Sequence, residues 1–263
     1  MTNARKAISS AKNPVVQQFR DAAAGGADGV LLAEGPRLVT EALDAGMQVV
    51  AAAVSPRCDD TALRDRLQQA TTTFLDVSPD VMARMSALET APGVAVLLRR
   101  PEVGEADLLR RDTVPLVVVA AGVRDPGNLG SLLRAAEAAG ASGCITMRGG
   151  ADPFRDKAVR GSMGSVFRLP VLHGLDAAAV IDFARRHHLQ LVVADGGGDR
   201  TYTEVDFRRP LLLVVGAEAA GVPAELVQAA SARACIPLRA PVESLNVAVA
   251  AGVLLFEVQR QRR

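Results

Sequence analysis

The C-terminal stretch PLLLVVGAEAAGVPAELVQAASARACIPLRAPVESLNVAVAAGVLLFE (210–257) decides the fold. It opens on an apolar run at 210–216, which is typical of a strand buried on both faces of a parallel sheet. A helical stretch and a second apolar strand candidate at 232–238 follow. A long apolar helix is then expected from about Ser244 to Gln259. This alternation of strand and helix predicts an open α/β domain.

The same alternation extends upstream to residue 114. Further buried strands are expected at PLVVVAAG (115–122), GCITM (143–147) and LQLVVAD (189–195), with helices between them. Residues 101–113 belong to the most polar stretch between two apolar runs, so we expect a linker there. The chain is therefore expected to form a domain over 1–100, the linker, and a second domain over 114–263.

The first hundred residues predict a small α/β domain. LLAEGPRLVTEALDAG (31–46) reads as one helix, because Leu38, Ala42 and Ala45 fall on one face and Gly46 is a stop signal. Strands are expected at QVVAAAVS (48–55) and VAVLLRRP (94–101), with another helix and strand between them over 60–77.

The composition is that of an ordinary globular protein, with 49% hydrophobic and 22% charged residues in a chain of 263. No apolar run reaches the ~18 residues that a membrane span needs, and the N-terminus lacks the apolar core of a signal peptide. A cytoplasmic protein is therefore expected. The scattered cysteines and histidines favour neither a disulfide framework nor a metal site; they are Cys58, Cys144, Cys235, His173, His187 and His188.

The net charge is only +1, but the basic residues are unevenly placed. Arg5, Lys12 and Arg20 lie in a segment without acids, and Arg155 and Arg160 lie in a second basic segment. Local patches of this kind bind phosphates even when the whole surface is neutral. The alternative for each cluster is an ordinary solvated surface.

Three unusual loops follow predicted strands of the second domain. They are GVRDPGNLG (122–130), GAEAAGVP (216–223) and PLRAPVESLN (237–246). Ligands of open α/β sheets bind beyond the carboxyl ends of the strands, so three loops that meet there form one site. The glycine spacing is not that of a dinucleotide fingerprint, which disfavours a nucleotide-dependent oxidoreductase.

Four side chains in and after these loops are candidates for chemistry. Arg134 lies nearly opposite the apolar stripe of its predicted helix, so it is not expected to be buried in the core. Ser244 is a good N-cap for the last helix, whereas an amide at Asn246 needs partners if it is buried. Glu218 is either a surface turn residue or a hydrogen-bond acceptor.

The order and spacing of the loops resemble a known family. NLGSLLRAAEAAG (128–140), LLLVVGAEAAGV (211–222) and CIPLRAPVESLNVAVAAGVLLFE (235–257) resemble the three motifs of the SpoU/TrmH family of RNA 2′-O-ribose methyltransferases. The resemblance covers most of residues 114–263. The first half of the chain is similar to the family's appended RNA substrate-binding domain.

The resemblance implies a deep trefoil knot in the C-terminal domain and S-adenosylmethionine as cofactor, with no metal. Together with the apolar final helix, it implies a homodimer paired through the C-terminal domain. The basic segments described above are expected to contact RNA through Arg5, Lys12, Arg20, Arg155 and Arg160. Cofactor-binding positions are Gly216, Ile236, Leu238, Leu245 and Asn246, and the reaction centre takes Asn128, Arg134, Glu218, Ser244 and Asn246. Ala217 and Ala219–Ala220 depart from relatives that carry Asn and Gly-Arg there.

Ribosomal RNA is the expected substrate, with transfer RNA as the alternative. A catalytically silent RNA-binding protein of the same fold is a further alternative, against which the complete set of polar residues argues. Arg134 is either the base that accepts the ribose proton, as proposed for the family, or a phosphate anchor. The second role suits a guanidinium group, which stays protonated in proteins.

Overall fold

The computed structural model describes residues 12–109, 113–217 and 221–263. Two of the candidate site residues, Arg5 and Glu218, lie outside these ranges. The chain divides into two compact units, one formed by Met1–Pro101 with Phe154–Arg160 and the other by Glu102–Pro153 with Gly161–Arg263.

The first unit contains a four-stranded sheet in the order β1-β4-β2-β3, in which only the β2–β3 pair is parallel. Val16 and Phe19 of the first helix and Met82 and Met85 of the fourth pack against its apolar strands. In chain order its elements are α1 (Pro14–Ala23), β1 (Val30–Glu34), α2 (Pro36–Asp44), β2 (Val49–Val54), α3 (Thr61–Ala70), β3 (Phe74–Asp76), α4 (Pro79–Met85) and β4 (Val94–Arg99).

The single helix predicted over 31–46 is wrong in its first part. Leu31 to Glu34 form strand β1, which pairs with β4, and only α2 after Gly35 is helical. Gly35 has a φ of +91°, a conformation open mainly to glycine, and Pro36 then starts the helix. The helical spacing of apolar residues across Ala33-Glu34-Gly35-Pro36 is coincidental. Residues 31–34 are extended because they pair with β4 in the sheet.

The second unit contains a seven-stranded sheet in the order β7-β6-β5-β10-β8-β11-β9, and every pair is parallel. Its strands are β5 (Leu116–Ala121), β6 (Gly143–Met147), β7 (Val171–Leu175), β8 (Gln190–Ala194), β9 (Arg200–Thr201), β10 (Leu211–Gly216) and β11 (Ala232–Cys235). Its helices are α5 (Pro126–Ala138), α7 (Ser165–Arg168), α8 (Ala177–Arg186), α9 (Ala224–Ala229) and α10 (Val247–Gln261), with the 3-10 turns η1 (Glu105–Leu109) and η2 (Tyr202–Glu204). Helix α6 (Asp156–Ser162) belongs to the first unit up to Arg160.

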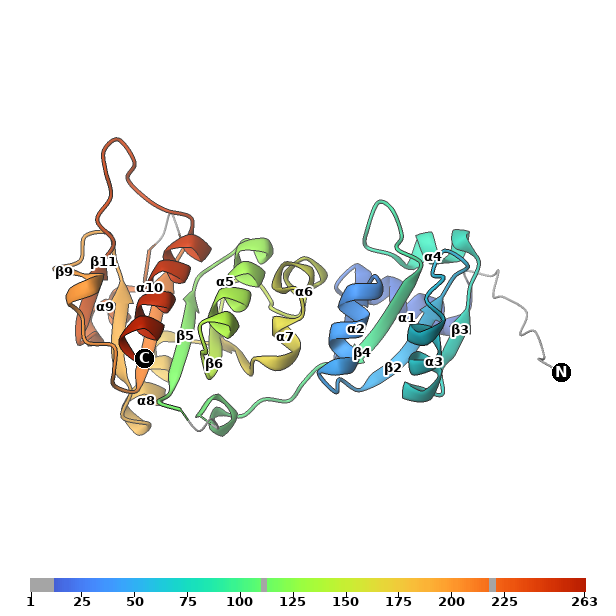
Figure 1. The fold of residues 1–263 in the computed structure, drawn as a ribbon, viewed down its shortest axis with the longest axis horizontal. Helices are drawn as coiled ribbons and strands as arrows, with labels where there is room; N and C mark the ends of the chain where they lie inside the picture. The colour runs from blue at the N-terminus through green and yellow to red at the C-terminus, as the bar shows by residue number, and fades with distance from the viewer. Residues whose placement is uncertain (1–11, 110–112, 218–220) are drawn as a thin grey trace. The chain divides into compact units, whose positions relative to one another are not determined.

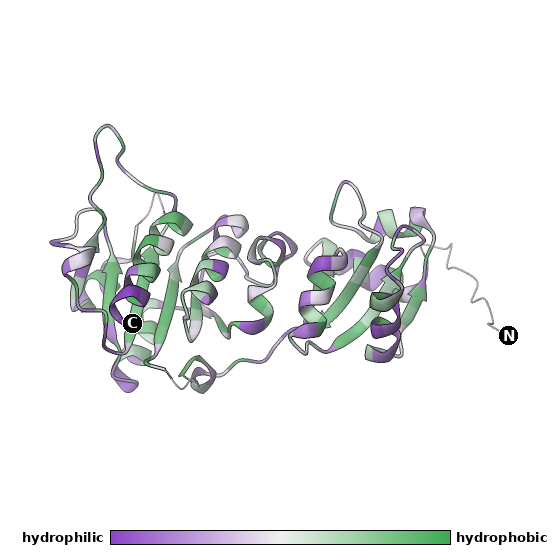
Figure 2. Cartoon of the chain, viewed as in Figure 1, coloured by the Kyte–Doolittle hydropathy of each residue, from purple (hydrophilic) through white to green (hydrophobic). Residues whose placement is uncertain are grey.

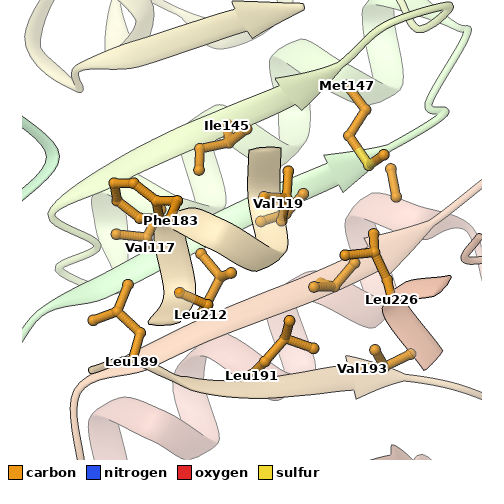
Figure 3. Close-up of a cluster of buried hydrophobic side chains, with 14 of the residues drawn as sticks. Val117, Val119, Ile145, Met147, Phe183, Leu189, Leu191, Val193, Leu212 and Leu226 are labelled. Carbon is orange, nitrogen blue, oxygen red and sulfur yellow. The ribbon is translucent and has the colours of Figure 1, made fainter. Parts of the chain in front are cut away.

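Helices cover both faces of this sheet, as its continuously apolar strands require. Phe183 of α8 and Leu226 of α9 pack on one face, against Val117, Val119 and Leu212 (Figure 3). Helices α5 and α10 pack against each other, and α10 also contacts β10. In Figure 2 the strands of both sheets are strongly hydrophobic. The α/β class and the parallel sheet of the second domain are confirmed.

All five strands predicted in the second domain are present, whereas β7 and β9 were not predicted from their pattern. Both are edge strands, so they are not buried on two faces and lack a continuous apolar run. The stretch expected to be a linker contains η1, whose Leu108 is fully buried in the core of the second unit.

Candidate active site

The carboxyl ends of β8, β10 and β11 meet at one edge of the second sheet, where they border a hollow of about 410 Å³. The connection 236–246 projects from this edge before α10 begins (Figure 1). A volume of this size suits a small organic ligand. The lining residues are Ala194, Asp195, Gly196, Gly197, Val215, Gly216, Ala234, Ile236, Leu238, Glu243, Ser244, Leu245, Val247, Ala250 and Leu254.

Gly216 brings two pieces of backbone closer together than a side chain permits. A Cβ atom at this position would lie 2.4 Å from the carbonyl carbon of Gly221. The amide of Gly221 donates to the carbonyl of Ala217 at 2.8 Å, and the amide of Ala217 donates to Ala121 of β5 at 3.1 Å. Ala217 and Gly221, the described residues on either side of 218–220, are therefore anchored to each other and to the sheet beside the lining residue Gly216.

The charged residues among the described lining residues are both acidic, Asp195 and Glu243. The Asp195 carboxylate accepts from the amide of Gly197 at 2.9 Å and from the Arg233 guanidinium at 3.4 Å. Glu243 is exposed. The other described lining residues are uncharged, so these two carboxylates favour a ligand that carries positive charge.

Asn246 joins two of the three loops. Its Oδ1 accepts from the amides of Ala248 and Val249, at 3.0 and 3.4 Å, and so caps α10. Its Nδ2 donates to Oδ1 of Asn128, at the start of α5, at 3.0 Å. The expectation that Ser244 caps this helix is wrong, because the connection continues for two further residues and the helix begins only at Val247.

The structure brings most of the expected cofactor residues together. Gly216, Ile236, Leu238 and Leu245 line the hollow, and so does Ser244. Asn128 and Asn246 lie beside it through their hydrogen bond but are not lining residues. Their roles, and that of Glu218 outside the described ranges, stay predictions.

Arg134 is exposed on α5, as its helical phase predicts, and does not line the hollow. Its guanidinium forms no ion pair with any residue in the described ranges. Of the expected RNA-binding residues, Lys12, Arg20 and Arg155 are exposed, and Arg160 forms an ion pair with Asp156.

Four further lining residues, Asp195, Gly196, Gly197 and Glu243, were not among the predicted site residues. The signal was available in ADGGGD (194–199), a polar glycine cluster directly after a predicted strand. Such a position at the end of a parallel strand points to the ligand edge. In the described part of the chain no group of His, Cys, Asp and Glu has the arrangement of a metal site. None of the helices described is long and apolar enough to cross a membrane.

Family models match both parts of the chain. The model of the SpoU rRNA methylase family matches residues 115–256, and that of the MRM3-like substrate-binding domain matches residues 20–96.

Individual relatives extend over the whole length. An uncharacterised tRNA/rRNA methyltransferase of Synechocystis sp. is 31% identical, over 100% of this chain and 96% of the relative. The 23S rRNA (guanosine(2553)-2′-O)-methyltransferase RlmP of Bacillus subtilis is 30% identical, over 97% and 99%. The crystal structure of the SpoU methyltransferase AviRb of Streptomyces viridochromogenes with AdoMet superposes with a TM-score of 0.86 at 29% identity, over 95% and 98%.

Proposed function

The chain belongs to the SpoU rRNA methylase family, and from this premise we propose that it methylates a ribose 2′-hydroxyl of ribosomal RNA, with S-adenosylmethionine as methyl donor. The single observation that carries the proposal is the hollow at the strand ends, bordered by Gly216, Ile236 and Leu245, with the Asn246–Asn128 hydrogen bond beside it. The rRNA substrate is supported by the full-length similarity to an enzyme named for 2′-O-methylation of 23S rRNA.

The residues around the hollow fit the proposed cofactor. S-adenosylmethionine supplies a methyl group on a sulfonium cation and also carries an ammonium group. Asp195 and Glu243 place negative charge on the wall, which attracts such a ligand. The backbone near Gly216 and Ile236 offers hydrogen-bonding groups, and Leu245 and Leu254 supply apolar contact.

The ribose hydroxyl is a poor nucleophile, so the protein must orient it and provide an acceptor for its proton. Ser244 is an exposed lining residue of the hollow, and in this proposal its hydroxyl holds the 2′-oxygen. Arg134 is exposed and without an ion pair among the described residues, which suits an anchor for the neighbouring phosphate. Orientation alone lowers such barriers by up to roughly 7–11 kcal/mol in ideal cases.

Methylation of a base carbon is the competing chemistry, and it usually needs a cysteine nucleophile. None of the three cysteines is among the described residues that line the hollow. Cys144 lies in β6, fully buried, and burial raises the pKa of its thiol to about 12. A thiol that remains protonated is a weak nucleophile. This argues for the ribose rather than the base as the methyl acceptor.

The proposal includes a division of labour between the domains over 1–100 and 114–263, joined by residues 101–113. The first, which carries the MRM3-like substrate-binding match, binds RNA with Lys12 and Arg20 among its exposed basic residues. Without it the methyltransferase domain is expected to keep its cofactor and lose most of its RNA methylation.

We also propose that the C-terminal chain is knotted. Helix α10 follows β11 and ends against the segment between η2 and β10, where Gln261 accepts from the amide of Phe207 at 2.9 Å and Arg262 donates to its carbonyl at 2.8 Å. A helix that passes beneath this segment threads the loop that joins β8 to β10. Such threading is exceptional among protein folds.

A homodimer through the C-terminal domain completes the proposal. Val249 and Phe256 of α10 are 53% and 49% exposed, and they lie seven residues apart on one face of the helix. Two large apolar side chains in solvent on the same helical stripe favour a second protein surface.

The test is transfer of radiolabelled methyl groups from S-adenosylmethionine to ribosomal and transfer RNA, followed by alkaline hydrolysis. Label that stays in an uncut dinucleotide of rRNA supports the proposal, because 2′-O-methylation removes the internal nucleophile. Arg134→Ala is expected to lower transfer roughly 10²-fold at unchanged cofactor affinity, with poor rescue by Arg134→Lys. Label on a free base, or a wild-type protein that binds RNA without any transfer, contradicts it.

A further inference from the structure

A second pair of hollows lies at the amino end of the same sheet, where β8 begins. Their volumes are about 520 and 330 Å³, and they share His188, Leu189, Gln190 and Ser231. Gln190 is the first residue of β8 and Asp195 directly follows its last, so the two edges are about 16 Å apart along the strand. These hollows are therefore separate from the candidate active site.

Two arginines give the hollows at the amino end of β8 a positive charge that no described acidic residue neutralises. Arg209 lines the larger hollow and Arg185 the smaller one. Neither guanidinium forms an ion pair with a residue of the described ranges. The neighbouring acids are already paired, Asp182 and Glu105 with Arg186 and Asp206 with Arg208. Two free guanidinium groups beside a hollow suit a phosphate group.

Gln190 lacks a hydrogen-bond partner in the same place. Its Oε1 atom is buried and accepts no hydrogen bond from any described residue. A buried carbonyl oxygen without a donor destabilises the folded state, because it has lost its hydrogen bonds to water. Because the side chain lines both hollows, a ligand with an N–H or O–H group supplies the donor that the protein lacks when the amide turns toward it.

His188 occupies a position that usually belongs to glycine. After α8 its amide donates to Arg185 and the amide of Leu189 donates to Ala184, which is the Schellman pattern of a helix end. His188 takes the left-handed position of this motif, with a φ of +52°. A side chain with a Cβ atom is strained there, so the imidazole stands beside the hollows at a cost in stability.

We propose that these hollows bind a nucleoside phosphate, with Arg185 and Arg209 on the phosphate and Gln190 on a ribose hydroxyl or base amino group. Leu189, Pro210 and Ile181 provide the apolar wall for the base. The nucleotide is either part of an RNA strand that extends past the methylation site or a free nucleotide. The RNA source rests on the proposed function, whereas the nucleoside phosphate chemistry does not.

The test uses the full chain and two probes, a short fluorescein-labelled single-stranded RNA and free adenosine 5′-monophosphate. The double variant Arg185→Gln/Arg209→Gln is compared with Arg208→Gln, a matched control whose arginine is already paired with Asp206 and does not line the hollows. Loss of two phosphate contacts is expected to reduce the slope of log affinity against log salt by roughly 1.4 for single-stranded RNA. The control is expected to keep the wild-type slope.

His188→Gly separates binding from folding. Glycine relieves the left-handed strain, so this variant is expected to unfold at a higher temperature. Because the change also removes an imidazole that lines both hollows, the variant is expected to bind the probe several-fold more weakly. A reduced slope for the labelled RNA identifies an RNA strand as the ligand. Loss of only adenosine 5′-monophosphate binding identifies a free nucleotide.

The proposal is overturned if the double variant Arg185→Gln/Arg209→Gln binds both probes with the same affinity and salt dependence as Arg208→Gln. Methyl transfer to rRNA by the wild type and by Arg208→Gln is measured in parallel. That measurement tests the proposed function independently of the second site.

Discussion

Replacing Asn246 with alanine removes three hydrogen bonds that organise the site. Two of them cap α10 and one joins Asn246 to Asn128. Loss of an N-cap typically costs about 1 kcal/mol, and a net intramolecular hydrogen bond contributes about 1 kcal/mol. We therefore expect Asn246→Ala to lower the free energy of unfolding by about 2 kcal/mol. For a chain of this size that corresponds to a drop in Tm of roughly 4–8 °C.

Two further variants divide this loss between its causes. Asn246→Asp keeps an oxygen that caps α10 but has no N–H to donate to Asn128, so it is expected to lose only about 1 kcal/mol. Asn128→Ala removes the same side-chain hydrogen bond from the other end. The double variant Asn128→Ala/Asn246→Ala is then expected to lose less than the sum of the single variants, by roughly 0.5–1 kcal/mol.

The assay is urea denaturation followed by circular dichroism, with S-adenosylmethionine affinity and methyl transfer measured on the same samples. Asn246→Ala is expected to weaken both activities, because the connection 236–246 that lines the hollow leads into the capped end of α10. Equal losses of stability in Asn246→Ala and Asn246→Asp would refute the capping argument. Strict additivity in the double variant would refute the link between the two loops.

Three further predictions concern the loop after β10, the dimer and pH. Gly216→Ala is expected to weaken cofactor binding at least tenfold, because its Cβ would clash with Gly221, whereas Gly252→Ala, with open space around it, binds normally in calorimetry. Phe256→Asp is expected to give a monomer in light scattering; a persistent dimer places the interface elsewhere. Glu105→Gln is expected to lower Tm only slightly at neutral pH, because solvent screens a half-exposed ion pair. The Arg186 guanidinium lowers the pKa of Glu105 from 4.5 to about 2, so its contribution is present above 4.5 and disappears as pH falls through about 2; a difference between the two proteins that persists in acid contradicts this.

The sequence by itself determined the class of the second domain and the places of its loops. Runs such as 116–121 and 211–216 are apolar at every position, which is typical of strands covered on both faces. The parallel sheet was therefore predicted from these runs and from their alternation with helical stretches. The exposure of Arg134 also followed from helical phase. The edge strand β7 has no continuous apolar run. It pairs with a strand on one side only, and most of its side chains are not fully buried.

The tertiary structure decided which residues meet. Local pattern placed Ser244 as the cap of α10, but the cap is Asn246, whose second role is to reach Asn128, 118 positions away in the chain. Leu31–Glu34 continued the helical spacing of the residues after them and yet became a strand, because β4 offers hydrogen bonds along its edge. Asp195 follows β8 and Glu243 lies in the connection after β11; because these two strands pair, both carboxylates reach the wall of one hollow. Spacing along the chain specifies the face of an element, whereas pairing across the sheet specifies which distant loops share an edge.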